Sequence, residues 1–376
     1  MKRIAVVALS ISPQHSGNKT YILNLLDDLF GISVGECRYF VLCNQYNAKI
    51  FKGIETQNSQ LVIFPSIVSN RYTRVLLEQV YLPFWLKRNK IDLLFAARNV
   101  LPLLAPCPKV IAVHSMHLNY ELTDMPWYQR IYGRTMLRAS AQRADAILAV
   151  SEYAGKTYAD LYHVSEDRLF VTYEGLKKFE STVDRSVKLP EGEFLLFVGT
   201  LFPHKNLHFL IRVFAQVAKR HSDTRLVVVG KDVNNMTSSL KEQAQALEVL
   251  DNIEFRGLVS DTELMELYQN ASVFVFPSLI EGFGLPVLEA MAHSVPVVAS
   301  NRTSVPEVVG DAGIILDPKD EMVWANTIIE LLEDKNLRHE MAVKGKERAS
   351  KFTWRRSAEI ALNCFHEVLS KANGPI

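Results

Sequence analysis

The stretch that decides the fold is SVFVFPSLIEGFGLPVLEAMAHSVPVVAS, residues 272–300. Its two ends, 272–276 and 295–300, are short and rich in valine, as buried β-strands are. Between them lies an apolar helical stretch that begins near Pro286. A strand, a helix and a second strand in this order predict a parallel strand pair joined by a helical crossover.

The same alternation of short apolar runs with helical stretches fills the chain. It predicts an α/β protein with two doubly wound parallel-sheet domains, 1–180 and 181–353. The polar and weakly periodic segment 177–193 is the predicted linker. The expected strands are 4–9, 39–43, 61–64, 92–96, 109–113 and 146–150 in the first domain, and 194–199, 225–230, 252–257, 272–276, 295–300 and 312–316 in the second.

Composition and charge set broad limits on function. The 376 residues are 48% hydrophobic and 22% charged, which is ordinary for a globular protein. Residues 1–180 hold 21 Lys and Arg against 15 Asp and Glu, a balance of +6, and the remainder holds 21 against 26, a balance of −5. A basic first half is consistent with an anionic surface or substrate, and solvated charge without a partner is the alternative explanation.

We expect no targeting signal at the start of this sequence and no metal-binding motif within it. The four cysteines form no CxxC pair, and the apolar run after Lys2 and Arg3 is too short for a signal peptide. Charged residues and prolines interrupt the apolar region 93–113, so we expect a cytoplasmic protein. DxD, HExxH, GxSxG, GxGxxG and protein-kinase motifs are absent, so we expect neither a tightly held metal nor a dinucleotide dehydrogenase.

Ligands of an open parallel sheet bind beyond the carboxyl ends of its strands. Several glycine and charged residues follow the expected strands at these ends. If the strand ends of the two domains face one another, these residues gather in one cleft. They are Gly17 and His114 in the first domain, and Gly199, Lys205, Arg256 and Glu281 in the second.

The glycine-rich turn before the helix at Pro286 is suited to an anion. The N–H groups of Phe283, Gly284 and Leu285 lie at a helix start, where backbone donors lack partners and a phosphate can bind. Ionised carboxylates only accept hydrogen bonds, so Glu281 and Glu289 suit the hydroxyls of a sugar and a ribose. The alternative is that Glu281 only complements the helix dipole and that Glu289 is solvated.

Two further residues have the position of ligand contacts. Lys205, in GTLFPHKNL (199–207), lies at a helix start and is suited to a diphosphate, a surface lysine being the alternative. Asn206 is predicted to cap that helix. His114 directly follows a buried strand, where a purely structural histidine is the alternative to one that faces the site.

Taken together, these motifs resemble the family 4 retaining glycosyltransferases, which have the GT-B fold. The resemblance covers nearly the whole chain and implies two Rossmann-like domains that face a central cleft. It also implies that residues 354–376 form a C-terminal helix crossing back to the N-terminal domain. The matching segments are EGFGLPVLE (281–289), FVGTLFPHKNL (197–207), SNRTSVPEVVGDAG (300–313), VHSMH (113–117), AVSEYAGK (149–156) and SGNKTYILNLL (16–26).

The resemblance implies transfer of a hexose from a nucleotide-sugar with retention at the anomeric carbon and without a cofactor or metal. Glu281 is expected to bind donor-sugar hydroxyls, Glu289 the ribose, Lys205 the diphosphate, and His114 the donor sugar or the acceptor. GDP-mannose is the favoured donor and a UDP-sugar the alternative. The expected catalytic residues are His114, Lys205 and Glu281, and the expected donor-binding residues are Gly17, Gly199, Thr200, Lys205, Arg256, Glu281, Phe283, Gly284, Leu285 and Glu289.

The chain departs from the family pattern in three places. Thr200 stands where many relatives have arginine, so Lys205 has no cationic helper there. Ser115 follows His114 where many relatives have aspartate, and Gly17 is single where many have two glycines. The last two departures concern the acceptor side.

The expected acceptor is a glycan or lipid-linked molecule in the synthesis of a surface polysaccharide or glycolipid. The helical stretch 127–143 spaces Arg130, Arg134 and Arg138 four apart beside aromatic residues, and 83–90 is also basic and aromatic. Such faces are either solvated or in peripheral contact with an anionic membrane. No nucleic-acid partner is expected. The alternative functions are a nucleotide-sugar epimerase or phosphorylase on the same scaffold, and a noncatalytic sugar-nucleotide-binding subunit.

Overall fold

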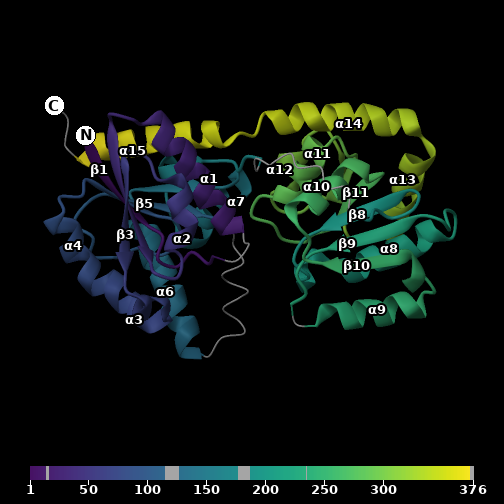
Figure 1. Cartoon of the computed structure of the whole chain (residues 1–376), viewed down its shortest axis with the longest axis horizontal. Helices are drawn as coiled ribbons and strands as arrows, with labels where there is room; N and C mark the ends of the chain where they lie inside the picture. Colours follow the sequence, from purple (N-terminus) through teal and green to yellow (C-terminus); the bar gives the residue numbers. More distant parts are fainter. Residues whose placement is uncertain (14–16, 115–126, 177–186, 234, 373–376) are drawn as a thin grey trace. The chain divides into compact units, whose positions relative to one another are not determined.

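The computed structural model describes residues 1–13, 17–114, 127–176, 187–233 and 235–372 (Figure 1). The chain forms two compact units. One contains Met1–Gly175 together with Thr353–Ile376, and the other contains Leu176–Phe352. Each unit is a Rossmann-like parallel sheet covered by helices, which is the predicted fold class.

The sheet of the first unit has seven parallel strands, and β1 lies near its centre. Along β1, Ala5 and Val7 join the apolar core beneath α4, α6 and α7, whereas the alternate residues face the opposite side. Because helices cover both faces of the sheet, the strands have continuous apolar sequences. Their spatial order is β3 (Ser59–Phe64), β2 (Cys37–Asn44), β1 (Lys2–Val7), β4 (Leu93–Ala96), β5 (Lys109–Val113), β6 (Ala146–Ala149) and β7 (Leu169–Val171).

The C-terminal helix α15 packs along α1 in the first unit, as predicted. Phe365 of α15 lies 5.5 Å from Phe95 of β4, ring centroid to ring centroid. Trp354 makes an edge contact with Tyr21 of α1 at 5.8 Å. The helices of this unit are α1 (Gly17–Ile32), α2 (Ala48–Phe51), α3 (Arg71–Leu76), α4 (Leu82–Arg88), α6 (Trp127–Arg143), α7 (Glu152–Tyr162) and α15 (Trp354–Ala372), with a π-helical turn η3 (Leu77–Tyr81) and 3₁₀ turns η1 (Lys52–Ile54), η2 (Ser66–Ser69) and η5 (Glu166–Arg168).

The second unit repeats this architecture with six parallel strands. Their order is β10 (Ile253–Gly257), β9 (Arg225–Val229), β8 (Phe194–Val198), β11 (Val273–Phe276), β12 (Val297–Ser300) and β13 (Ile314–Leu316). The helices are α8 (Leu207–Ala218), α9 (Met236–Ala246), α10 (Asp261–Asn270), α11 (Leu285–Ala292), α12 (Val305–Val309), α13 (Glu321–Glu333) and α14 (Lys335–Ser350), with 3₁₀ turns η6 (Pro203–Lys205) and η7 (Leu250–Asn252).

Every strand predicted from the sequence is present, with ends that differ by a few residues at most. The edge strand β7 was not predicted, because three partly buried residues give too short an apolar run. Ser260 caps the start of α10, since its hydroxyl accepts from the Glu263 N–H at 3.1 Å. The predicted side-chain cap by Asn206 is wrong. This residue is at the cap position of α8, but its amide donates instead to the carbonyls of Pro277 and Pro318.

In both sheets the strand order reverses direction at the first strand of the unit, β1 or β8. The loops after β1 and β4, and those after β8 and β11, therefore diverge to opposite faces. In doubly wound sheets this switch point is the usual ligand site. Among the residues that the structure describes, no helix is both long and apolar enough to cross a bilayer.

Candidate functional site

Two predicted site residues meet at the switch point of the second unit. Lys205 ends the 3₁₀ turn after β8, and Glu281 lies in the loop after β11. The Lys205 Nζ atom donates to Glu281 Oε1 at 2.5 Å, and each side chain is 11% exposed. The ammonium also lies 5.1 Å from the centroid of the Phe276 ring. The structure thus places one cation and one carboxylate together at the end of two adjacent strands.

The loops that carry this ion pair are tied to each other by hydrogen bonds. The Leu279 N–H donates to the His204 carbonyl at 2.8 Å, and the Ser278 hydroxyl donates to the same oxygen at 3.3 Å. The Ser300 hydroxyl, at the end of β12, donates to the Ser278 carbonyl at 2.5 Å. These bonds fix the loop after β11 between the ends of its two neighbours.

The loop before α11 is held from one side by two hydroxyl residues. The Glu281 N–H donates to Thr303 Oγ1 at 3.0 Å, and the Ser304 hydroxyl donates to the carbonyls of Glu281 (3.2 Å) and Phe283 (2.9 Å). In a trans peptide the C=O and the following N–H point in opposite directions. Because both carbonyls face Ser304, the N–H groups of Gly282 and Gly284 point away from it.

Backbone N–H groups without a helical partner lie at the start of α11, as at any helix start. Gly284 is at the cap position with φ of 113°, a backbone conformation that favours glycine. Leu285 is the first helical residue, so its N–H is among the donors with no partner within the helix. The Phe283 ring is buried against Phe352, at 5.7 Å between centroids. The backbone donors of the turn thus belong to the same loop as Glu281, three to four residues after it.

Glycines make room where the loops after β8 and β9 approach each other. Gly230 has φ of 153°, and a Cβ atom there would lie 1.9 Å from the Gly199 carbonyl oxygen. A Cβ atom on Gly199 would lie 3.6 Å from Lys205 Cε, which is an ordinary contact distance, so the crowding is at Gly230. Thr200 follows in the same loop and is partly buried.

Glu289 projects from the second turn of α11, and its carboxylate has a fixed partner. The hydroxyl of Tyr268, on α10, donates to Glu289 Oε2 at 2.9 Å. Arg256 is engaged elsewhere, because its guanidinium pairs with Glu254 at 2.8 Å and Glu263 at 3.1 Å. Its side chain therefore links β10 to α10.

The two predicted site residues of the first unit lie near the carboxyl ends of its strands. Gly17 is the exposed first residue of α1, and no described atom lies within 4 Å of a Cβ atom built there. His114 follows β5 and is buried, with its ring 4.5 Å from that of Tyr21 in an edge contact. Residue 115 and His117 lie outside the described residues.

His114 is electrically neutral around neutral pH. Burial lowers its pKa to about 4, outweighing the opposing effect of the hydrogen bond to the Ala97 carbonyl, and the nearby Arg98 lowers it further. The Ala97 oxygen can only accept, so His114 Nε2 carries the proton in their 3.0 Å contact. Nδ1 is then an acceptor, and it has no hydrogen-bond partner within the described part of the chain.

The chain is similar to two known protein families and to named glycosyltransferases. The family described as Glycosyl transferases group 1 matches residues 179–348, and that described as Glycosyltransferase Family 4 matches residues 35–177. The O-antigen chain mannosyltransferase RfbU of Salmonella typhimurium is 30% identical over 306 residues, 78% of this chain and 82% of the relative. This chain belongs to the family 4 glycosyltransferases.

Other relatives and solved structures extend the comparison. O-antigen chain mannosyltransferase B of Escherichia coli is 31% identical, covering 62% of this glycosyltransferase and 64% of the relative. The serotype-specific mannosyltransferase WbdA of Escherichia coli is 28% identical, and the match spans only 30% of its length. The structure of Anabaena Alr3699/HepE in complex with UDP and glucose has a TM-score of 0.74 at 19% identity, covering 98% of this chain and 100% of HepE, which shows the shared fold.

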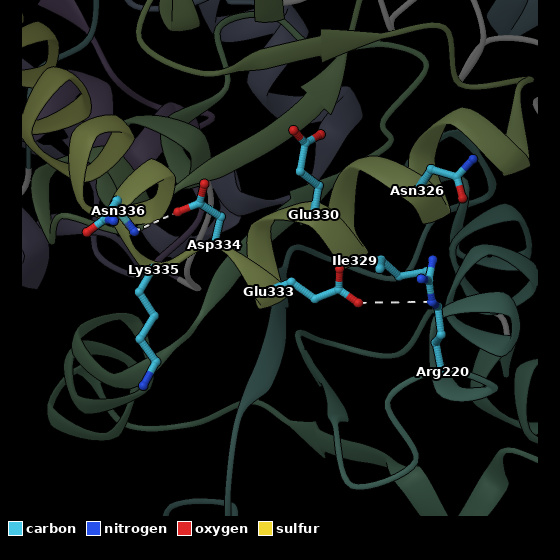
Figure 2. Close-up of a pocket in the computed structure, with 8 residues that line it drawn as sticks. All are labelled: Arg220, Asn326, Ile329, Glu330, Glu333, Asp334, Lys335 and Asn336. Carbon is cyan, nitrogen blue, oxygen red and sulfur yellow. Dashed lines mark hydrogen bonds and ion pairs between the residues drawn. The ribbon is translucent and has the colours of Figure 1, made fainter.

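A pocket of about 690 Å³ in the second unit is lined by residues of α13, the start of α14 and the turn after α8, and by none of the predicted site residues (Figure 2). Arg220, which follows α8 and precedes β9, lines it, so the pocket is at the amino ends of the strands. Its carboxylates, on Glu330, Glu333 and Asp334, would repel an anionic nucleotide. The Glu333 carboxylate is paired with Arg220 at 4.0 Å. This pocket is therefore not the donor site.

Sequence reasoning missed the residues that support the site of this glycosyltransferase. Thr303 and Ser304 lie within the quoted motif 300–313, but no role was assigned to them. Two adjacent hydroxyl residues in a motif that matches the family are the sequence feature that could have indicated a role in holding the turn. Tyr268 is a single aromatic residue on an amphipathic helix and gives no such signal. Among the described residues, no group of three or more His, Cys, Asp and Glu side chains could hold a metal ion.

Proposed function

We propose that this family 4 glycosyltransferase moves a hexose from a nucleotide-sugar to a glycan or lipid-linked acceptor, with retention, in the synthesis of a surface polysaccharide. The observation that carries the proposal is the Lys205–Glu281 pair, whose carboxylate comes from the loop that leads into α11. The mannosyltransferase names of RfbU and its Escherichia coli relative favour GDP-mannose as the donor. A UDP-sugar is the alternative, because the HepE structure contains UDP and glucose.

In the proposed reaction the diphosphate binds against Lys205 and the N–H groups before α11. These groups are fixed before the reaction, so they stabilise the negative charge as it grows on the leaving diphosphate. The bond from the anomeric carbon to the phosphate oxygen breaks, and the acceptor oxygen forms its bond on the same face. The acceptor proton passes to the departing phosphate. Glu281 and Glu289 bind hydroxyls and are neither nucleophile nor acid, and no resident metal is assigned.

His114 is proposed to contact a sugar hydroxyl from the first unit. Its neutral ring has an acceptor at the buried Nδ1 atom with no hydrogen-bond partner among the described residues, which suits a hydroxyl donor rather than a phosphate. Because its pKa is lowered to about 4, the histidine is a poor proton acceptor at neutral pH. Its proposed contribution is therefore to orient the donor sugar or the acceptor.

The proposal is tested by transfer of labelled sugar from GDP-mannose and UDP-glucose to a lipid-linked oligosaccharide, with and without EDTA. We expect acceptor-dependent product from one donor, undiminished by EDTA and with the donor's anomeric configuration. Lys205→Ala should abolish it, whereas Lys344→Ala, which removes a surface lysine also paired with a carboxylate, should not. Product without acceptor would indicate an epimerase or phosphorylase. Nucleotide binding without turnover would indicate a noncatalytic subunit.

We also propose that the first unit contacts an anionic membrane through the outer face of α3, η3 and α4. Tyr72, Leu76, Val80 and Phe84 are 54–71% exposed on this segment. In an α-helix, each residue lies about 40° further round the helix axis than the residue four positions before it. The π-helical turn Leu77–Tyr81 has more residues per turn, so it rotates the next side chain back toward the same face. The four side chains therefore form one apolar stripe, and exposed basic residues follow it at Lys87, Arg88 and Lys90.

On α6, Trp127 and Ile131 are also exposed, beside Arg134 and Arg138.

Vesicle co-sedimentation tests the membrane contact. Binding to phosphatidylglycerol-containing vesicles should exceed binding to phosphatidylcholine alone and should fall as salt is added. Phe84→Ser with Leu76→Ser should weaken it at least about tenfold, because two large apolar side chains no longer enter the lipid. Val343→Ser, at an equally exposed apolar residue of the second unit, is the control. Equal losses in both variants would contradict the assignment of the stripe.

A further inference from the structure

The carboxylate of Glu289 accepts a hydrogen bond from Tyr268, a residue that has no role in the proposed function. Tyr268 is fully buried on α10, and its hydroxyl lies 2.9 Å from Glu289 Oε2 and 3.4 Å from the Pro286 carbonyl. A phenol has one proton to donate, and the shorter contact is with the carboxylate. The hydroxyl therefore joins α10 to the side chain of α11 that is expected to bind ribose.

The protonation state of Tyr268 suits a permanent donor. Burial raises its pKa well above its ordinary value, and the adjacent carboxylate of Glu289 raises it further. The phenol consequently keeps its proton at neutral pH. It acts on Glu289 as a hydrogen-bond donor and not as an acid.

The ring of Tyr268 is fixed by its neighbours. It stacks on His293 with 5.4 Å between centroids and 13° between planes, and it packs against Phe274 at 5.8 Å. His293 Nδ1 lies 2.8 Å from the Glu289 carbonyl oxygen, so the stacking partner is itself attached to the residue that Tyr268 contacts. Tyr268, Glu289 and His293 thus form a closed set of contacts on one side of α11.

We propose that Tyr268 is a positioning residue that fixes the Glu289 carboxylate for the nucleoside ribose, and thereby sets the preference for a ribonucleotide over a deoxynucleotide. The inference rests on the proposed function of Glu289 as a ribose ligand. A carboxylate has about four acceptor sites, so one bond from Tyr268 is compatible with bonds from ribose hydroxyls. Without the phenol, the glutamate must lose its own rotational freedom when the nucleotide binds.

The test compares dissociation constants for GDP and 2′,3′-dideoxy-GDP, and for UDP and its dideoxy form, measured by titration calorimetry. The full-length protein should prefer its ribonucleotide, and Glu289→Gln should abolish the preference. Tyr268→Phe should reduce the preference by about tenfold, all of it through weaker ribonucleotide binding. In the Glu289→Gln background the same change should have no effect, because Tyr268 acts through that carboxylate. Tyr158→Phe removes a buried hydroxyl of the first unit that has no hydrogen-bond partner among the described residues, and it should change neither affinity.

The outcomes separate this inference from the function on which it rests. If Glu289→Gln keeps the full preference, the ribose assignment fails and the inference fails with it. If Glu289→Gln loses the preference but Tyr268→Phe keeps it, or weakens both nucleotides equally, only the inference is overturned. Phenylalanine retains the ring contacts of Tyr268, so we expect the variant to fold. If it does not, Glu289→Asp draws the carboxylate back from the phenol and should produce the same selective loss.

Discussion

Lys205 and Glu281 are 76 positions apart in the sequence, and their side chains meet at 2.5 Å with each only 11% exposed. The contact joins the strand ends on either side of the point where the sheet order reverses. An ion pair that is largely removed from water is strongly coupled, so the loss of one partner leaves an uncompensated charge. The pair is therefore expected to matter for both folding and catalysis, and these two contributions can be separated.

Lys205→Ala should lower kcat by about 100-fold or more, because the diphosphate loses its cation in the transition state. It should also lower the free energy of unfolding by about 3 kcal/mol, since Glu281 is left unpaired. The double variant Lys205→Met with Glu281→Gln removes both charges and should recover most of the stability but none of the activity. Denaturant unfolding and sugar-transfer rates measure the two effects. Recovery of activity in the double variant would contradict the proposed role of the lysine.

Ser304→Ala should weaken nucleotide binding by about 1–2 kcal/mol, because the carbonyls of Glu281 and Phe283 lose the hydroxyl that orients them. The matched control is Ser140→Ala, which removes a buried hydroxyl that accepts from the Leu101 N–H in the first unit. Calorimetric titration with the donor nucleotide should show the loss for Ser304 alone. Equal stability losses with unchanged affinity in both variants would make Ser304 purely structural.

Gly230→Ala should destabilise the second unit far more than Gly257→Ala. Both glycines have positive φ, 153° and 64°, but only at Gly230 would a Cβ atom meet another group, the Gly199 carbonyl at 1.9 Å. At Gly257 the substitution should lower the free energy of unfolding by about 1 kcal/mol, from the strained backbone conformation alone. At Gly230 the loss should be several times as large, because the Cβ atom also meets the carbonyl. Thermal unfolding of the two variants checks this difference. Similar melting temperatures would mean that the loops can separate without disturbing the sheet.

The elements that could be predicted from the sequence are those determined by local pattern. The buried strands, the start of α11 and the Ser260 cap depend on residues that are adjacent or a few positions apart. The contacts of Asn206 could not be predicted, because its partners at Pro277 and Pro318 lie 71 and 112 positions away. The bond from Tyr268 to Glu289 likewise depends on the contact between two helices, which precede and follow β11 along the chain. Long-range hydrogen bonds of single side chains leave no periodic signal in the sequence.

His114 should make the first unit less stable in acid. Its pKa in the folded protein is lowered from 6.5 to about 4, so below pH 6.5 the unfolded chain takes up a proton that the folded protein does not. The stabilisation by neutral His114 is complete above about pH 6.5 and is lost as the pH falls towards 4, to a total of roughly 2–4 kcal/mol. Denaturant unfolding of the protein and of His114→Asn at several pH values measures this contribution as the difference between them.

The difference measurement is needed because Glu78, also in the first unit, acts in the opposite direction. Burial raises the pKa of this carboxyl from 4.5 to about 7, against the effect of Arg74, so its stabilisation is complete below pH 4.5 and is lost as the pH rises to about 7. The two groups oppose each other over nearly the same range, and the protein as a whole can show a shallow profile. His114→Asn should make stability fall more steeply as the pH rises from 4.5 to 6.5, and Glu78→Gln should make it rise more steeply. Parallel profiles for His114→Asn and the unmodified protein would show that the histidine is not buried in its neutral form.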